Sequence, residues 1–420
     1  LKPFWLKPQR GVDHVMTNTA ATAEDLSGVL STRDGCLLNK GWILKDDYFP
    51  ALNRLPERII GAPNFRRGNP SGQWQIYGLA QPTRDAIPKV LEQVDAATPR
   101  GAAILWINAR AEPVLYLNGR PWSLKRSGDP RKHCEFANGD SGHTQALEMI
   151  LKGEVLEERT RYGGRVLVHE ESDACSAAWL PLEEVLTVQE AFDEVRSTRS
   201  SPKVDFLRWP VNDTQAPMEA RFNEIARKLC NLHGERLSVV KVICNCHQGR
   251  GRTTTAMMIV HMLLDFIWQA ERHAACPAYT PASCAPLLLF APVRGQPLHN
   301  VGSWDEKLRE GHSVAVACAG LYDDMLNLYD AMRDKYDSFK KSTSHDAHLE
   351  LCHCVERFSY VVLFATFLQH CREAGNCCTL FRQWMHNLQS EFSIYTRLHQ
   401  TKDVEVIATY MDANSTRAKL

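Results

Sequence analysis

A short segment in the second half of the chain, Asn245–Thr255, has the residue types and the spacing that phosphate-ester chemistry needs. It places five residues between Cys246 and Arg252. An apolar run at 239–244 predicts a strand before the segment, and helical spacing at 254–269 predicts a helix after it. A thiolate at the end of that strand would face backbone N–H groups and a helix N-terminus, which favour an anion. The segment therefore predicts a phosphate-binding loop with Cys246 as its nucleophile.

The other residues of the loop each have a physical use. Gly249 and Gly251 permit the unusual dihedral angles that turn successive N–H groups inward as an anion nest. The planar fork of Arg252 matches two phosphate oxygens, and the hydroxyl of Thr253 can donate to the sulfur when water cleaves a phosphocysteine. The residues predicted to bind substrate are His247, Gln248, Gly249, Arg250 and Gly251. The alternative, a small buried cysteine beside an ordinary glycine turn, explains fewer of these positions.

The reaction also needs a general acid, because an alkoxide leaves poorly unless it is protonated. Asp213 follows a predicted strand and precedes a helix that begins near Pro217, so it lies in a loop able to close over the site. An aspartate in an ordinary polar turn would look the same, and Asp205 is a rival. Arg110 and Glu112, just past another predicted strand, are expected at the rim of the site or in a salt bridge within their own loop.

Strand and helix patterns alternate along the first two thirds of the chain. Strands are predicted at 102–108, 165–169, 204–209 and 239–244, and helices at 84–94, 144–162, 187–196, 217–232 and 254–269. This alternation indicates an α/β fold with a mostly parallel central sheet flanked by helices. Further helical patterns at 313–341, 345–374 and 379–399 predict an extra C-terminal helical layer on that sheet.

The domain organisation follows from composition shifts along the chain. We expect an irregular leader or linker at 1–30, a phosphatase-like core at 31–275, a proline-rich loop or insertion at 276–312, a helical region packed on the core at 313–400 and a tail at 401–420. Five prolines between 276 and 297 mark the insertion.

Composition excludes several other functions. Lys plus Arg equals Asp plus Glu at 49 each, so no overall field favours nucleic acid. The longest apolar run, 256–268, is too short to span a bilayer, and no transmembrane segment is expected. The 14 cysteines are scattered, which predicts free thiols and a cytoplasmic location. We expect no cofactor and no metal site, because Cys352 and Cys354 would face different sides of a helix.

An ordered series of motifs resembles the paladin family, within the larger group of tyrosine-phosphatase-like inositol phosphatases, also called cysteine phytases. The motifs are Arg33-Asp-Gly, Gly61-Ala-Pro-Asn-Phe-Arg, Tyr77-Gly-Leu-Ala-Gln-Pro-Thr, Trp106-Ile-Asn-Ala-Arg-Ala-Glu-Pro, Tyr116-Leu-Asn-Gly-Arg-Pro, Tyr162-Gly-Gly and Asn245-Cys-His-Gln-Gly-Arg-Gly-Arg-Thr-Thr-Thr. The resemblance spans Arg33 to about His399. Paladin-like proteins carry such repeats in tandem, so this chain is expected to be one repeat of a longer protein.

The resemblance implies that Cys246 is the nucleophile, Arg252 the phosphate clamp and Asp213 the general acid. One position departs from the wider group: most tyrosine phosphatases have histidine directly before the nucleophile, and here it is Asn245. Several paladin-like loops also lack that histidine. The change therefore fits the family and bears on the catalytic rate.

Three functions remain open from the sequence. The first is hydrolysis of inositol phosphates or phosphoinositides, favoured by the extra cations Arg250 and His247, since several phosphates need several positive charges. The second is a protein tyrosine or dual-specificity phosphatase, for which no aromatic recognition loop is evident. The third is a scaffold that binds phosphate without turnover, which Asn245 supports. The partner is a phosphorylated substrate in each case, and the sequence gives no oligomeric state.

Overall fold

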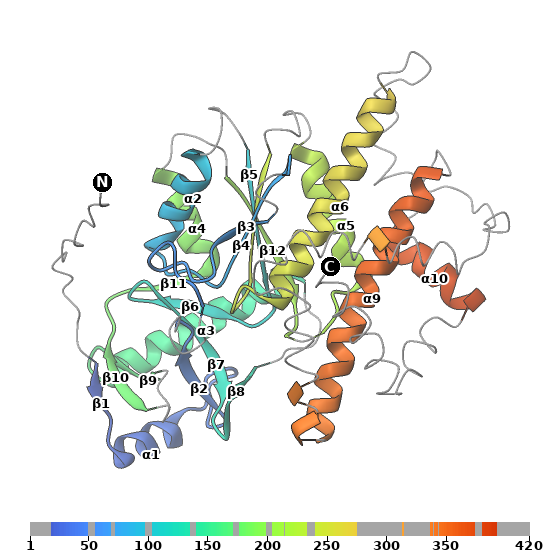
Figure 1. Cartoon of the computed structure of the whole chain (residues 1–420). Coiled ribbons are helices and arrows are strands. Elements are labelled where there is room, and N and C mark those ends of the chain that lie inside the picture. The colour runs from blue at the N-terminus through green and yellow to red at the C-terminus, as the bar shows by residue number, and fades with distance from the viewer. Residues whose placement is uncertain are drawn as a thin grey trace, which may run out of the picture.

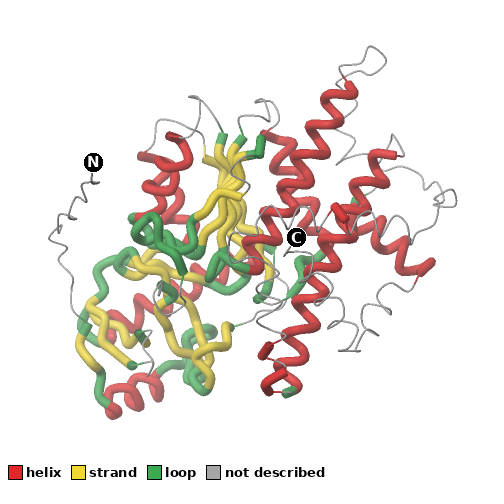
Figure 2. Tube along the Cα trace, in the orientation of Figure 1, coloured by secondary structure: helices red, strands yellow, loops and turns green. Residues whose placement is uncertain are grey.

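The described structure, a computed structural model, contains two β-sheets with helices packed on both (Figures 1 and 2). It describes residues 18–48, 55–68, 72–96, 103–134, 140–170, 176–198, 204–213, 215–232, 240–274, 313–314, 337–338, 340–342, 344–373 and 380–392. The predicted insertion at 276–312, the tail at 401–420 and most of the predicted helix at 313–341 lie outside these residues.

A five-stranded sheet forms the centre of the molecule. Its strand order is β12 (Val204–Val211), β5 (Ile104–Arg110), β13 (Lys241–Asn245), β4 (Gln75–Leu79) and β3 (Arg66–Gly68). The first four strands are parallel, and β3 runs antiparallel to β4. Asn245 pairs in register with Leu79 and Asn108, so the carboxyl ends of these strands meet at one edge. The predicted α/β fold with a mostly parallel sheet is confirmed.

Helices cover both faces of this sheet, as Figure 1 shows. The side chains of each strand alternate between two cores, because successive residues of a strand point to opposite faces. One core packs against α2 (Ala86–Ala96) and α4 (Val188–Thr198) and includes Trp106. The other packs against α5 (Glu219–Leu232) and α6 (Gly251–Ala274).

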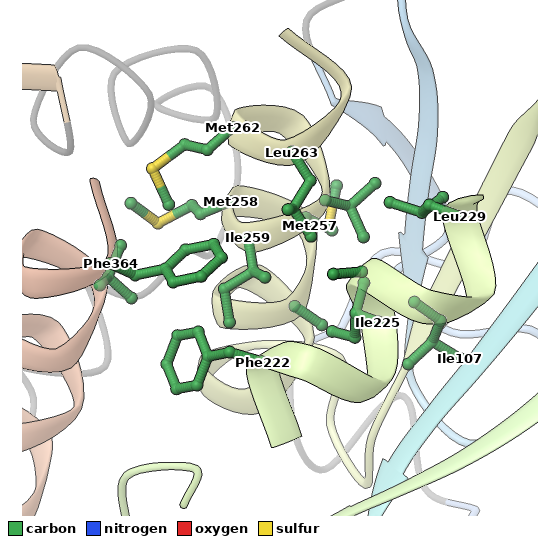
Figure 3. Close-up of a cluster of buried hydrophobic side chains, with 14 of the residues drawn as sticks. Ile107, Phe222, Ile225, Leu229, Met257, Met258, Ile259, Met262, Leu263 and Phe364 are labelled. Carbon is green, nitrogen blue, oxygen red and sulfur yellow. The ribbon is translucent and has the colours of Figure 1, made fainter. Parts of the chain in front are cut away.

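The second core extends outward into a further helical layer, formed by α9 (His345–Glu373) and α10 (Phe381–Phe392). Figure 3 shows Phe364 beside the methionine-rich face of α6 and beside Phe222. The ring centroids of Phe222 and Phe364 lie 4.8 Å apart. The helical layer predicted at 345–374 is therefore packed on the core. By length and composition α9 could also cross a membrane over Leu349–Arg372, but 71% of that stretch is buried in the protein.

A second sheet of eight strands adjoins the carboxyl edge of the first, and the sequence analysis did not anticipate it. Its order is β1 (Thr19–Ala20), β10 (Ala177–Pro181), β9 (Arg165–His169), β2 (Trp42–Asp46), β7 (Arg120–Arg126), β6 (Val114–Leu117) and β11 (Val185–Thr187), with β8 (Asp129–His133) beside β7. The pairing is antiparallel except between β2 and β9. Helix α3 (Ser141–Arg161) packs its apolar side, including Leu151, on this sheet. Only β9 was predicted among these strands.

The last part of the predicted leader at 1–30 is regular structure, which corrects that interpretation. Strand β1 pairs with β10 at the edge of the second sheet. Helix α1 (Ala23–Thr32) begins with a capping box, in which Thr22 and Asp25 each bond the backbone N–H of the other. Thr22 followed three positions later by Asp25 is the sequence pattern that would have predicted this helix.

Candidate active site

The segment predicted to bind phosphate forms a tight loop between β13 and α6. Gly249 adopts a φ of 72°, in the left-handed region, and a side chain there would clash with the backbone of Leu79 and Ala80. On the same side, the Gln81 N–H donates to the carbonyl of His247 at 3.0 Å. The loop thus passes directly against the end of β4, and only glycine fits at position 249.

Asn64 supports the outside of the loop. Its side-chain amide donates to the carbonyls of Gln248 and Gly249, both at 3.2 Å, and its own φ is 56°. Arg66 in turn donates to the Asn64 carbonyl at 3.1 Å. These bonds fix the carbonyl oxygens of Gln248 and Gly249 and so hold the shape of the loop.

Asn245, in place of the histidine usual in tyrosine phosphatases, is fully buried and uses both ends of its amide. Its oxygen accepts the indole N–H of Trp106 at 2.9 Å, and its nitrogen donates to Gln81 at 3.0 Å. The Gln81 amide donates onward to the Tyr116 hydroxyl at 2.8 Å. Asn245 therefore fixes the end of β13 within a buried hydrogen-bond network, directly before the nucleophile.

Cys246 and Thr253 lie where the sequence predicted, and both are buried. The Thr253 hydroxyl donates to the carbonyl of Leu79 at 3.4 Å, a long hydrogen bond. It therefore tethers α6 to β4 in this structure, and its predicted donation to the sulfur stays a prediction.

Arg252 lies between the carboxylates of Glu112 and Asp213. Its two Nη groups donate to the carboxylate of Glu112 at 2.7 and 3.0 Å, and Nη1 also donates to the Val211 carbonyl at 3.0 Å. Its Nε lies 3.4 Å from Oδ1 of Asp213. Burial alone would lower the pKa of Arg252, but the charges of Glu112 and Asp213 outweigh burial and raise it well above its usual value. The guanidinium is thus held as a cation at the edge of the loop.

Glu112 belongs to the short connection between β5 and β6, where the two sheets join. Besides Arg252, its carboxylate accepts from Nε of Arg110 at 2.9 Å. Arg110 also lies 2.7 Å from Asp47, which follows β2. Burial would raise the pKa of the Glu112 carboxyl, but Arg252 and Arg110 hold it well below its usual range. The salt bridge expected between Arg110 and Glu112 is present, and Glu112 also contacts Arg252.

Asp213 lies just past the end of β12, and its carboxylate is 42% exposed. Burial would raise its pKa, but the charges of Arg252 and His133 outweigh burial and lower it well below its usual range. The rival Asp205 lies near the opposite end of β12, where it pairs with Lys228 at 3.0 Å. The structure therefore brings Asp213, and not Asp205, to the site.

The second sheet contributes residues that the sequence analysis missed, namely Asp47, Lys125 and His133. Nζ of Lys125 lies 2.7 Å from both ring nitrogens of His133. His133 lies 3.9 Å from Asp213, and its ring meets that of His247 edge-on with centroids 4.9 Å apart. Nε2 of His247 lies 3.3 Å from Asp47. We call Asp47, Lys125 and His133 the second-sheet cluster.

Lys125 is the lysine of this cluster, and its side chain is buried. Its side chain is 4% exposed, and burial lowers its pKa to about 8, even though Asp47 favours the charged form. No spacing in the sequence marked Lys125 or His133, because each lies among other charged residues of its strand.

Among the described residues, no group of three His, Cys, Asp or Glu side chains could hold a metal ion. The described cysteines Cys36, Cys134, Cys230, Cys244, Cys246, Cys352 and Cys354 are free thiols. Cys371 is disulfide-bonded, which differs from the expectation of free thiols throughout.

Comparison with known proteins bears out the resemblance. Residues 107–264 match the family model described as PTP-like phytase, inositol hexakisphosphate. Paladin from Xenopus tropicalis is 24% identical over 409 residues, which cover 94% of this chain and 44% of the relative. Paladin from Gallus gallus is 30% identical over 237 residues, which cover 56% of this chain and 26% of the relative. The chain spans less than half the length of the curated relatives it matches.

Two solved structures show a partial likeness. The tandemly repeated protein tyrosine phosphatase like phytase from Mitsuokella multacida has a TM-score of 0.45 and 13% identity, and the match covers 82% of this chain and 49% of that one. The PTP-like myo-inositol phosphatase from the same organism, in complex with myo-inositol-(1,3,4,5)-tetrakisphosphate, has a TM-score of 0.44, 12% identity and the same coverage.

Proposed function

We propose that this chain, which is related to the paladins and to the protein-tyrosine-phosphatase-like phytases, hydrolyses phosphate monoesters of inositol through a phosphocysteine at Cys246. The observation that carries the proposal is the arrangement around Cys246. A glycine-dependent loop, the clamp Arg252 and the acid Asp213 meet at the carboxyl edge of the parallel sheet. This edge is where α/β sheets bind their ligands.

In the proposed reaction the sulfur of Cys246 attacks phosphorus, and the bond from phosphorus to the ester oxygen breaks. Asp213 gives its proton to the leaving oxygen, and the phosphoryl group is carried on sulfur. A water molecule then attacks phosphorus, loses a proton to Asp213 and releases inorganic phosphate and the thiolate. The loop N–H groups and Arg252 bind the phosphoryl oxygens in both steps.

The ion pair between Asp213 and Arg252 has a role in this cycle. A proton donor must be protonated, and the pair holds the pKa of Asp213 low in the structure without substrate. An incoming phosphate dianion competes with Asp213 for Arg252 and adds negative charge beside the carboxylate. Both effects raise the pKa of Asp213, so the acid becomes protonated when substrate is present.

The inositol substrate class is supported by cations that the chemistry at one phosphate does not require. Lys125 reaches the site from the second sheet, and Arg250 belongs to the loop itself. His133 and His247 line the same site, where burial lowers the pKa of both imidazoles, so they offer hydrogen bonds in their neutral form. A single phosphotyrosine is satisfied by the loop and Arg252. Further phosphates on a compact ring would use the additional cations.

A phosphate-binding module without turnover is the second candidate. It is favoured by the fork of Arg252, whose two Nη groups are taken by Glu112. In such a module phosphate would bind the loop, but Arg252 would stay paired with Glu112 and would not stabilise a transition state.

Phosphate release by the purified chain tests the proposal. The panel contains inositol hexakisphosphate, a phosphoinositide in vesicles, 4-nitrophenyl phosphate and a phosphotyrosine peptide, with Cys246→Ser as the matched control. We expect release from the inositol substrates and none above background with Cys246→Ser, because a hydroxyl is far less acidic than a thiol. Calorimetric binding without release would support the binding module, and preference for the peptide would support a protein phosphatase. We also propose a cytoplasmic location, which imaging of a tagged chain tests.

A further inference from the structure

Arg357, on the C-terminal helical layer, reaches the loop that carries the proposed acid. It belongs to α9, is 2% exposed, and donates from Nε to the carbonyl of Gln215 at 2.8 Å. Gln215 stands two positions after Asp213 in the sequence. Arg357 lies outside the residues 107–264 that match the phytase family, so the match assigns it no role.

Two charged groups of the site, Asp213 and Arg252, lie within electrostatic range of Arg357. Burial lowers its pKa, as does the charge of Arg252, while Cys354, Asp213 and Cys246 act in the opposite direction. Within the described part of the chain, its Nη2 is buried without a hydrogen-bond partner. A buried donor left in this way is costly unless another group uses it.

Contacts with α5 fix the position of helix α9 near Arg357. The Tyr360 hydroxyl donates to Glu219 of α5 at 3.1 Å, and Phe364 packs on Phe222 of the same helix. One face of α9 is therefore fixed to the helix that follows the acid loop, and Arg357 extends from that face to the loop itself. The acid loop is thus held between β12 and α9.

We propose that Arg357 is a positioning residue for the general acid, which holds the loop around Gln215 so that Asp213 points at the leaving oxygen. The proposal rests on the proposed function for its kinetic consequence, while its structural consequence is independent of turnover. By this proposal, the guanidinium of Arg357 connects the C-terminal helical layer to the loop that carries the general acid.

The structural consequence is measured by hydrogen–deuterium exchange of peptides covering residues 211–218. Arg357→Ala should raise exchange there, and Arg357→Lys should restore part of the protection, because its ammonium can still donate to the carbonyl. Leu349→Ala is the matched control, since Leu349 is exposed on the same helix and its replacement should leave these peptides unchanged. Unchanged exchange in Arg357→Ala would overturn the proposal, even if the chain has no turnover.

The kinetic consequence is a dependence on the leaving group. Arg357→Ala should lower kcat on inositol hexakisphosphate by about 10- to 100-fold, because small misplacements of catalytic groups are costly. The loss on 4-nitrophenyl phosphate should be only a few-fold, since its leaving group needs little protonation. Equal losses on both substrates, or a rise in KM alone, would show that Arg357 binds the phosphate or supports the fold, and would exclude a positioning role.

Failure of the proposed function gives a different result. If the unaltered chain releases no phosphate from any substrate, the phosphatase proposal fails. The exchange experiment then still decides whether Arg357 holds the acid loop. Unfolding of Arg357→Ala is detected by circular dichroism, and Arg357→Lys serves in its place in that case.

Discussion

The two regions that meet at the site are built differently. The phosphate-binding loop is one continuous segment, and the turn between β13 and α6 positions all of its residues at once. The second-sheet cluster of Asp47, Lys125 and His133 comes from three separate places on an antiparallel sheet. The residues of the loop are therefore neighbours in the sequence, whereas the cluster is assembled only when β2, β7 and β8 are paired.

This difference suggests that the two regions act on different parts of the substrate. The loop, with Arg252, carries the chemistry at one phosphate, and the second-sheet cluster acts on the rest of the substrate. If so, changes at Cys246 and Arg252 should affect every substrate, whereas changes at Arg250, on the rim of the loop, and in the cluster should affect polyphosphorylated substrates selectively. The variants below test that division, beginning with the largest expected effect.

Asp213→Asn should slow hydrolysis of inositol hexakisphosphate by about 10²- to 10⁴-fold, the usual contribution of a positioned proton donor. The loss on 4-nitrophenyl phosphate should be smaller, because its leaving group is a weaker base. Steady-state kinetics on both substrates measure the ratio. Asp205→Asn, on the same strand but paired with Lys228, is the control and should behave as the unaltered chain. Equal losses on both substrates would point to a structural role for Asp213.

Arg252→Lys should lower kcat/KM by roughly 10²- to 10³-fold on every substrate, the scale for losing one charge-stabilising donor. A point charge cannot reproduce the two-pronged contact that Arg252 makes, here with Glu112. The same assays measure the effect. A selective loss on polyphosphorylated substrates alone would break the proposed division, because it would place this loop residue with the second-sheet cluster.

Glu112→Gln should lower the free energy of unfolding by about 3–5 kcal/mol, because it removes the buried carboxylate that pairs with both Arg110 and Arg252. The folded pKa of Glu112 is depressed, so its stabilisation is present above its ordinary value of 4.5 and is lost as pH falls through the folded pKa. Urea denaturation at several pH values should therefore show a gap between the two proteins that is widest above pH ~5. The exposed Glu183→Gln is the control, and a constant gap at all pH values would contradict this account.

Lys125→Met should raise KM for inositol hexakisphosphate by roughly 5- to 150-fold, since a charged hydrogen bond contributes about 1–3 kcal/mol. Arg250→Ala should raise this KM by a similar factor. Both substitutions should change the KM for 4-nitrophenyl phosphate only a few-fold. The pKa of Lys125 is about 8, so its charge is lost as pH rises through that value. The advantage of the unaltered chain over Lys125→Met should therefore fade above pH 8. Lys89→Met is the control, because Lys89 is exposed on α2. Equal effects of Lys125→Met on both substrates would contradict the proposed inositol substrate class.

The parallel sheet and its loop were predictable because their signals are local. The apolar run before Cys246, the glycines and the helical spacing after Arg252 are all adjacent in sequence. The same holds for β9, which matches its predicted strand. The structure places Asp213 beside Arg252 and Asp205 beside Lys228, and the role of Asp213 as proton donor stays a prediction.

The second sheet was not predictable in the same way. Its strands are short, and β7 carries charged or polar residues at Arg120, Ser123 and Lys125, some of which are buried. Buried polar residues break the alternation that marks a half-exposed strand. The contacts of Lys125, His133 and Arg357 with the site depend on residues far away in sequence, which no local pattern encodes.

The position of α9 also has a consequence for how the chain is made. On the ribosome, α6 emerges well before α9, and until α9 arrives the methionine-rich face of α6 has no cover from Phe364 (Figure 3). Exposed apolar surface of this kind promotes aggregation of partly folded chains. The proposed nucleophile, Cys246, is therefore synthesised before the helix that covers this core. The need for chaperones should be greatest in that interval.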